Sequence, residues 1–289
     1  MNGIFLDLSV ADEVNSAVMG FVQAHGEFFL AIAHFLLTWM LVPLERALLA
    51  TPAWVALPAI ALLAWHATRR IGVVVVLTVG LYLIGSFGLW DKLMQTVALM
   101  IVATLLTLAI GLPLGIWMSG SERLRNVLQP VLDVMQTLPT FVYLVPVLML
   151  FGLGKVPALL ATVVYALPPL VRLTDLGIRQ VDASVVEAAQ SFGTTRMQRL
   201  FSVQLPLARP SIMAGMNQAV MMALAMVVIA SMIGARGLGE DVLAGINNMD
   251  MGRGLQGGLA IVILAVVIDR ITQAYGVGKR QRELGAKKS

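Results

Sequence analysis

The residues whose types and spacing could carry a function lie in one polar stretch, residues 173–210, which separates two strongly apolar segments. Connections between helices in compact bundles are usually short, so a loop of this length needs a reason. The stretch is not of low complexity, and its pattern is typical of an ordered segment. Its small and charged residues suit contact with another protein. The chemistry that we expect here is therefore recognition of a partner, and not the making or breaking of bonds.

The first half of this stretch has the pattern of a short amphipathic helix. Val185, Val186, Ala189 and Phe192 recur at intervals of three and four residues. Ser184 is the expected N-cap, and Glu187, three residues further on, would complete a capping box.

The second half predicts another helix. Gly193 is a natural terminator of the first helix, and Thr194 or Thr195 can cap the second, which should end before Pro206. The pattern indicates a helix–turn–helix on the membrane surface, a compact knob that is presented to a partner.

Elsewhere the sequence offers little for catalysis. It contains no cysteine, and His25, His34 and His66 do not have the spacing of metal ligands. No Gly-x-x-x-x-Gly-Lys-Ser/Thr phosphate loop occurs. The glycine-rich residues 234–239 do not follow a strand and are better explained as a turn. We therefore expect no metal site, no cofactor and no catalytic residue in this chain.

The composition of the chain indicates that the polar stretch is held by helices in a membrane. Hydrophobic residues make up 58% of the chain and charged residues 12%, against about 25% charged in soluble domains. The mean hydropathy is +0.87. These values predict an all-α integral membrane protein, a polytopic helical bundle in the lipid bilayer. The pI of about 9.7 does not indicate nucleic acid, because the basic residues lie in short loops between apolar segments.

Apolar stretches near the length needed to cross a bilayer predict about seven spans. They cover residues 52–65, 71–90, 93–118, 130–151, 156–172, 211–234 and 255–275. Lys and Arg gather in alternate gaps and in the tail, which places the polar stretch and the C-terminus in the cytoplasm. This divides the chain into an N-terminal segment, residues 1–50, a transmembrane domain, residues 51–275, and a basic cytoplasmic tail, residues 276–289.

The N-terminal segment is apolar over residues 28–49 and contains Pro43, which we expect to end the helix. No Lys or Arg precedes Arg46, whereas Asp7, Asp12, Glu13 and Glu27 do. An acidic terminus without basic residues is disfavoured in the cytoplasm. We therefore favour an outer N-terminus with an interfacial or partly embedded helix, and an eighth span is the alternative.

The polar stretch resembles the signature loop of permease subunits of bacterial ATP-binding-cassette (ABC) importers. That signature is Glu-Ala-Ala, Gly four residues later, an aliphatic residue, and Leu-Pro; here it reads Glu187-Ala188-Ala189, Gly193, Val203 and Leu205-Pro206. Residues 111–117, 136–146, 166–174, 204–208 and 226–233 further resemble permeases of glycine betaine/proline betaine importers.

The resemblance implies a type I importer fold and a definite set of partners. These are a second copy of the permease, a pair of cytoplasmic ATPases that bind ATP and Mg²⁺, and an external substrate-binding protein in the periplasm or outside the cell. The implied location is the bacterial inner membrane, and the implied solutes are glycine betaine, choline, carnitine and proline betaine. Glu187 would contact the ATPase, and Ala188 and Ala189 would keep that surface thin.

Prolines and aromatic residues inside the spans are candidates for the translocation pathway. Pro139, Pro146, Pro168 and Pro169 break intrahelical hydrogen bonds, which suits either a wall that bends or a static kink. Phe141 and Tyr143 could offer ring faces to a quaternary ammonium group, or could serve only in packing.

Two other functions remain open from the sequence. The first is an ABC permease for another small solute, such as an amino acid or a sulfonate. The second is a secondary transporter, which the absence of Asp, Glu, Lys and Arg from the centres of the strong spans disfavours. An enzyme is not expected, because the sequence shows no pairing of a nucleophile with a base.

Overall fold

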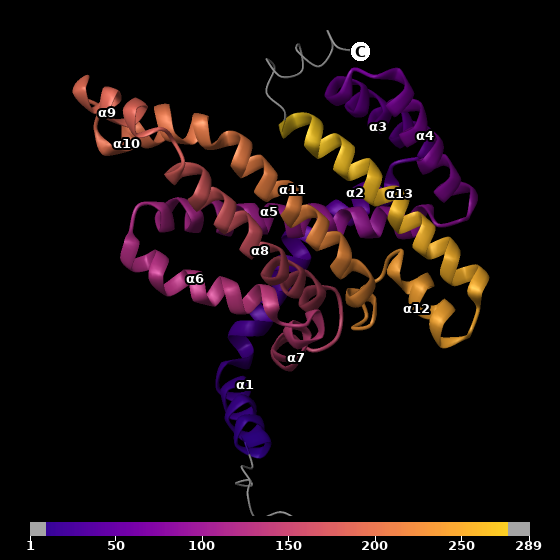
Figure 1. The fold of residues 1–289 in the computed structure, drawn as a ribbon. Helices are drawn as coiled ribbons and strands as arrows, with labels where there is room; N and C mark the ends of the chain where they lie inside the picture. Colours follow the sequence, from indigo (N-terminus) through magenta and orange to yellow (C-terminus); the bar gives the residue numbers. More distant parts are fainter. Residues whose placement is uncertain (1–9, 277–289) are drawn as a thin grey trace, which may run out of the picture.

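The computed structural model describes residues 10–276, and every regular element in that range is helical (Figure 1). The predicted basic tail, apart from its first residue, lies outside the described residues. The helices are α1 Val10–Phe35, α2 Val42–Ala50, α3 Ala53–Thr68, α4 Ile71–Ser86, α5 Trp90–Ser119, α6 Glu122–Thr137, α7 Thr140–Phe151, α8 Lys155–Arg179, α9 Ala183–Ser191, α10 Arg196–Arg199, α11 Leu205–Ser231, α12 Gly239–Asn247 and α13 Met251–Gly276. Two π-helical segments, η1 Leu36–Leu41 and η2 Leu200–Gln204, precede α2 and α11.

Helix α8 lies at the centre of the bundle, packed between α5 and α11. Glycines allow the close approach on both sides. A Cβ atom added to Gly115 of α5 would lie 2.7 Å from Cβ of Thr174, and one added to Gly177 of α8 would lie 2.6 Å from Cβ of Ser211. Small residues at helix interfaces are the usual means of association in a bilayer, where the hydrophobic effect gives no preference for helix over lipid.

The number of spans differs from the prediction of about seven. Five helices in the described range are long and apolar enough to cross a membrane, or six if a bent pair counts as one span. The predicted spans at 52–65 and 71–90 are α3 and α4, each of 16 residues. A helix of that length extends about 24 Å, less than the roughly 30 Å of a hydrocarbon core.

The predicted span at 130–151 is the bent pair. Helices α6 and α7 meet at an angle of 103°. Pro139 causes the break, because the residue before a proline is driven out of the helical region. Leu138 accordingly has an extended backbone, with φ −67° and ψ 134°.

The helical run in the N-terminal segment is longer than predicted, and it does not end at Pro43. The helical run Asn15–Ala50 meets the length and composition of a span. The π-helical turn η1 explains why Pro43 is tolerated: the amide of Val42 donates to the carbonyl of Leu37, five residues back. This wider turn relieves the conflict that a proline ring creates in an α-helix.

A buried ion pair fastens this segment to the bundle. Nζ of Lys155 lies 2.6 Å from both carboxylate oxygens of Glu45, joining α2 to the first residue of α8. The side chain of Glu45 is buried, so the pairing is needed to offset the cost of removing its charge from water.

The end of the bundle opposite α9 is closed by α12. Residues 232–238 form the expected turn, in which the amide of Leu238 donates to Oγ1 of Thr96 at 2.9 Å. Asp241 accepts from Nζ of Lys92 at 2.5 Å and from Nε of Arg253 at 2.8 Å. Burial opposes ionisation of Asp241, but these two hydrogen bonds outweigh it and hold its pKa below the ordinary value.

The glycine contacts of α8 give the first prediction. We expect Gly177→Ala to lower the thermal stability of the detergent-solubilised protein, because its Cβ would meet Ser211 and the carbonyl of Ala208. Overpacking of this kind costs about 1–3 kcal/mol. The matched control is Gly258→Ala in α13, where an added Cβ meets nothing within 4 Å. Equal melting temperatures for the two variants, measured by size-exclusion chromatography after heating, would contradict the close-packing role.

Candidate functional site

The predicted helix–turn–helix is present, and it forms a projection at one end of the bundle. Helices α9 and α10 follow the end of α8 and lead through η2 into α11 (Figure 1). We refer to residues 183–204 as the knob. Glu187 and Ala188 are exposed on α9, and Ala189 is partly buried.

The N-cap of α9 is Asp182, and the prediction of Ser184 was wrong. A carboxylate oxygen of Asp182 accepts from the amide of Ser184 at 2.9 Å. This backbone hydrogen bond lowers the pKa of Asp182 below its ordinary value. Because the helix begins two residues earlier than expected, Glu187 lies beyond the N3 position and cannot complete a capping box. The capping role proposed for Glu187 is removed, and its exposed side chain is left for contact with a partner.

Gly193 makes the turn between the two short helices, as predicted. Its φ is +79°, a region that glycine enters without steric cost. The amide of Gly193 donates to the carbonyl of Gln190 at 2.8 Å, and that of Thr194 to the carbonyl of Ala189 at 3.3 Å. These two bonds are the pattern of a Schellman motif, which satisfies the last carbonyl groups of the helix.

The second helix is capped as predicted but ends differently. Thr195 and Gln198 form a reciprocal capping box at the start of α10. The chain then stays helical through η2 and past Pro206, so the expected break before this proline is wrong. In η2 the amide of Leu205 donates to the carbonyl of Leu200, five residues back, which admits the proline ring. Leu205 and Pro206 therefore belong to the first turn of α11.

Several large apolar side chains of the knob are exposed. Phe192 is 89% exposed, and Met197 and Phe201 are 63% and 58% exposed. Sequence periodicity assigned Phe192 to the packing face of an amphipathic helix; on that face Val186 and Ala189 are partly buried, whereas the side chain of Phe192 is exposed. An exposed apolar group rimmed by polar residues marks an interaction surface.

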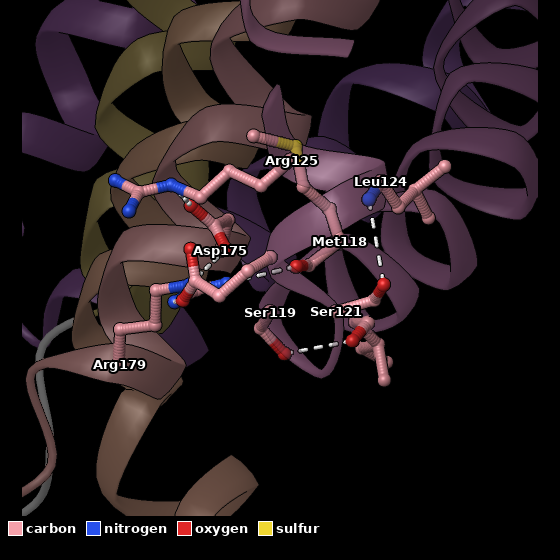
Figure 2. Close-up of polar contacts among 9 residues, drawn as sticks. Met118, Ser119, Ser121, Leu124, Arg125, Asp175 and Arg179 are labelled. Carbon is pink, nitrogen blue, oxygen red and sulfur yellow. Dashed lines mark hydrogen bonds and ion pairs between the residues drawn. The ribbon is translucent and has the colours of Figure 1, made fainter. Parts of the chain in front are cut away.

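Charged residues brace the base of the knob, and sequence analysis did not single them out. Figure 2 shows Arg125 of α6 and Arg179 of α8 converging on Asp175. Oδ1 of Asp175 lies 2.8 Å from Nε of Arg179, and Oδ2 lies 3.3 Å from Nε of Arg125. Arg179 lies four positions from Asp175 on α8, but Arg125 lies 50 positions away, so local patterns could not reveal that the two arginines share one carboxylate.

The structure places the six candidate pathway residues on α7, its N-cap included, and on α8, two helices that pack against each other. Tyr143 is buried, its hydroxyl donates to the carbonyl of Met135, and its ring meets that of Tyr165 at 5.8 Å. Phe141 is 53% exposed. Pro139 caps α7 and Pro146 lies within it, while Pro168 and Pro169 are buried in α8.

An apolar cavity of about 540 Å³ lies elsewhere, between α2, α3, α5, α11 and α13. None of the six candidates lines it.

The fold is shared with solved importers. The membrane chain of the MetNI methionine ABC transporter in an inward-facing crystal form matches with a TM-score of 0.56 at 20% identity, covering 68% of this chain and 95% of that chain. An amino acid ABC transporter crystallised with histidines matches with a TM-score of 0.52 at 21% identity, covering 69% and 92%. At this level of identity the likeness concerns the fold, and it confirms the prediction of a type I importer permease bundle.

Closer relatives are permease proteins. The glycine betaine/proline betaine transport system permease protein ProW of Escherichia coli (strain K12) is 52% identical over 238 residues, which cover 82% of this chain and 67% of that protein. The ProW protein of Salmonella typhimurium is 53% identical, and the match spans 62% of its length. The glycine betaine transport system permease protein OpuAB of Bacillus subtilis (strain 168) is 47% identical over 77% of this chain and 78% of that protein.

The family model that matches the chain covers the elements built above. Residues 108–276, from the second half of α5 through the knob to the end of α13, match the model described as binding-protein-dependent transport system inner membrane component. This match confirms the expectation of a membrane transport subunit rather than an enzyme. The chain belongs to the family of inner membrane components of binding-protein-dependent transport systems.

Proposed function

We propose that this chain is the permease subunit of an ABC importer for glycine betaine or a related quaternary-ammonium solute. Choline, carnitine and proline betaine are the related solutes. The support for the solute class is the 47–53% identity to permeases named for glycine betaine transport. An amino acid or a sulfonate is the alternative substrate, and a secondary transporter is the alternative mechanism.

The observation that carries the coupling role is the knob. Glu187, Ala188 and Ala189 lie on α9, the turn at Gly193 fixes the angle to α10, and the side chain of Phe192 is exposed. Such a surface suits a groove on a cytoplasmic ATPase, with Phe192 as an aromatic anchor and Glu187 as a charged contact at its rim. Leu205 and Pro206 would carry the movement of the knob into α11.

We infer the wider assembly from the same resemblance. Two copies of this permease would bind two ATPases, which hold ATP and Mg²⁺, and an external binding protein would deliver the solute. Phe141, Tyr143 and the four prolines, Pro139, Pro146, Pro168 and Pro169, remain candidates for the wall of the pathway. In this proposal they would meet the solute only between two permease copies.

Charge reversal at Glu187 tests the proposed function. We expect Glu187→Lys to remove the ATPase that co-purifies with the wild-type chain and to abolish uptake of labelled glycine betaine into cells. The charge reversal Glu240→Lys on α12 is the control and should retain the ATPase. Wild-type ATPase recovery with Glu187→Lys would refute the docking role. Wild-type cells that take up another labelled solute but not glycine betaine would refute the assigned substrate.

Substitutions at Gly193 test whether the turn depends on its backbone conformation or on the size of the side chain. An added Cβ at this position meets nothing within 4 Å, so only the positive φ penalises it. We expect Gly193→Asn to keep uptake near the wild-type level, because Asn tolerates the left-handed region. Gly193→Val would destabilise the turn by roughly 1–2 kcal/mol, because valine is disfavoured in the left-handed region, and it should reduce uptake strongly. Equal uptake by the two variants at equal membrane levels would show that the turn does not matter.

We propose that the knob and the C-terminus face the cytoplasm and that the N-terminus lies outside, because no Lys or Arg precedes Arg46. The absence of cysteine makes labelling direct. A single cysteine at Ser16 should react with a membrane-impermeant maleimide in cells whose outer membrane is opened, and a cysteine at Ser184 should react only after the inner membrane is opened. Protection of the Ser16 site until that second step would instead establish that the run Asn15–Ala50 crosses the membrane.

A further inference from the structure

Six charged side chains join α6 to the C-terminal end of α8, and we call them the ion ladder. Its pairs run antiparallel along the two helices: Glu122 with Arg179, Arg125 with Asp175, and Asp133 with Arg172. On α8 these residues are three and four positions apart, so they share one face of the helix. Three residues separate Arg179, the last member of the ladder, from the first residue of α9.

Arg179 is the junction of the ladder. Besides Glu122 and Asp175, it reaches the end of α5, where its Nη2 donates to the carbonyl of Met118 at 3.1 Å (Figure 2). This carbonyl belongs to the last turn of α5, whose carbonyl groups have no partner within the helix. A cation there is also favoured by the helix dipole. Arg179 thus ties three helices together at the point from which the knob extends.

Asp175 depends on these partners. Its side chain is only 4% exposed, and each of its oxygens faces one guanidinium group. A carboxylate that is buried without partners would be strongly destabilising. The two arginines cannot separate from Asp175 without leaving that charge unpaired, so the ladder resists relative movement of α6 and α8.

Few other contacts could hold α6 in place. The apolar contact beneath the ladder is a small cluster centred on Met118, Leu132 and Val171. Beyond Pro139, α6 continues into α7, and the hydroxyl of Tyr143 bridges that bend by donating to the carbonyl of Met135. A force applied to α6 would therefore reach α7.

We propose that the ion ladder makes α6 and the C-terminal end of α8 one rigid unit. Movement of the knob would then be carried to the bent pair α6–α7. Asp175 is the positioning residue of this unit. The inference rests on the proposed function in one respect, that an ATPase moves the knob. The rigidity of the unit is a property of this chain alone and can be tested without the partner.

Distances between spin labels test this rigidity. Labels at Val127 on α6 and Leu207 on α11 occupy exposed positions, and α11 packs on α8 through Gly177. In lipid nanodiscs we expect one narrow distance distribution for the otherwise unchanged chain. Asp175→Asn should broaden it or add a second distance. Asp182→Asn, which neutralises an exposed carboxylate at the N-cap of α9, should leave it unchanged.

Arg125→Gln provides a second route if Asp175→Asn does not fold. It removes one of the two cations that pair with Asp175, and it should likewise broaden the distance distribution or add a second distance. A distribution for both variants that matches the unsubstituted chain would overturn the proposal, since a ladder that can be cut without effect does not hold the helices together.

The complex with its ATPase then tests transmission. Trapping with ATP and vanadate should leave the distance from Val127 to Leu207 unchanged, while Asp175→Asn should lose transport of labelled glycine betaine per ATP hydrolysed and still retain the ATPase. A shift of that distance in the unsubstituted complex would show that α6 slides on α8 and would overturn the proposal. Absence of the ATPase, or of glycine betaine transport, from the unsubstituted complex would count against the proposed function, and the nanodisc distances would still decide the ladder.

Discussion

The close approach of α8 to its two neighbours is the constraint on which the rest of the structure depends. Gly115 brings α5 onto one side of α8, and Gly177 and Gly215 bring α11 onto the other. Between lipid-facing helices, dispersion contacts at short range replace the hydrophobic effect as the source of stability. Because α8 leads into the knob and α11 leads out of it, the same contacts that hold the bundle together also set the distance between the two ends of the knob.

Charge serves a different purpose in this bundle, because buried ion pairs join individual elements to it at defined points. Glu45 and Lys155 attach the N-terminal segment, Asp241 attaches α12, and the ion ladder attaches α6. Each site contains a carboxylate that is largely withdrawn from water and that is paired with at least one cation. In the interior of a membrane protein such pairs are specific in direction, so they fix where a helix lies rather than how strongly it is bound.

Local patterns were enough to predict the features that depend on neighbouring residues. The short helix that carries Glu187, the turn at Gly193 and the cap at Thr195 all depend on interactions within five positions, and they were predicted from the sequence, although the capping role expected for Glu187 was wrong. The apolar runs similarly predicted the long helices α5, α8, α11 and α13. The shift of the N-cap from Ser184 to Asp182 shows the limit of this reasoning, because both residue types cap helices well.

Features that depend on distant residues could not be predicted. Arg125 lies 50 positions from Asp175, and Lys155 lies 110 positions from Glu45, so no periodicity connects these pairs. The count of candidate spans differs from the prediction for a related reason: composition alone does not show that Pro139 bends one apolar stretch by 103° or that α3 and α4 stop at 16 residues.

The π-helical turns before Pro43 and Pro206 have a consequence for chain length. Each residue of an α-helix advances the rotation by about 100°, and a π turn contains one residue more than an α turn. The angular phase of α11 relative to the knob is therefore set by the residue count of η2. Loss of one residue from Leu200–Gln204 would rotate the face that carries Ala208, Ser211 and Gly215 away from α8 by roughly that angle. The packing of α11 against α8 thereby fixes the length of the π-helical segment that precedes it.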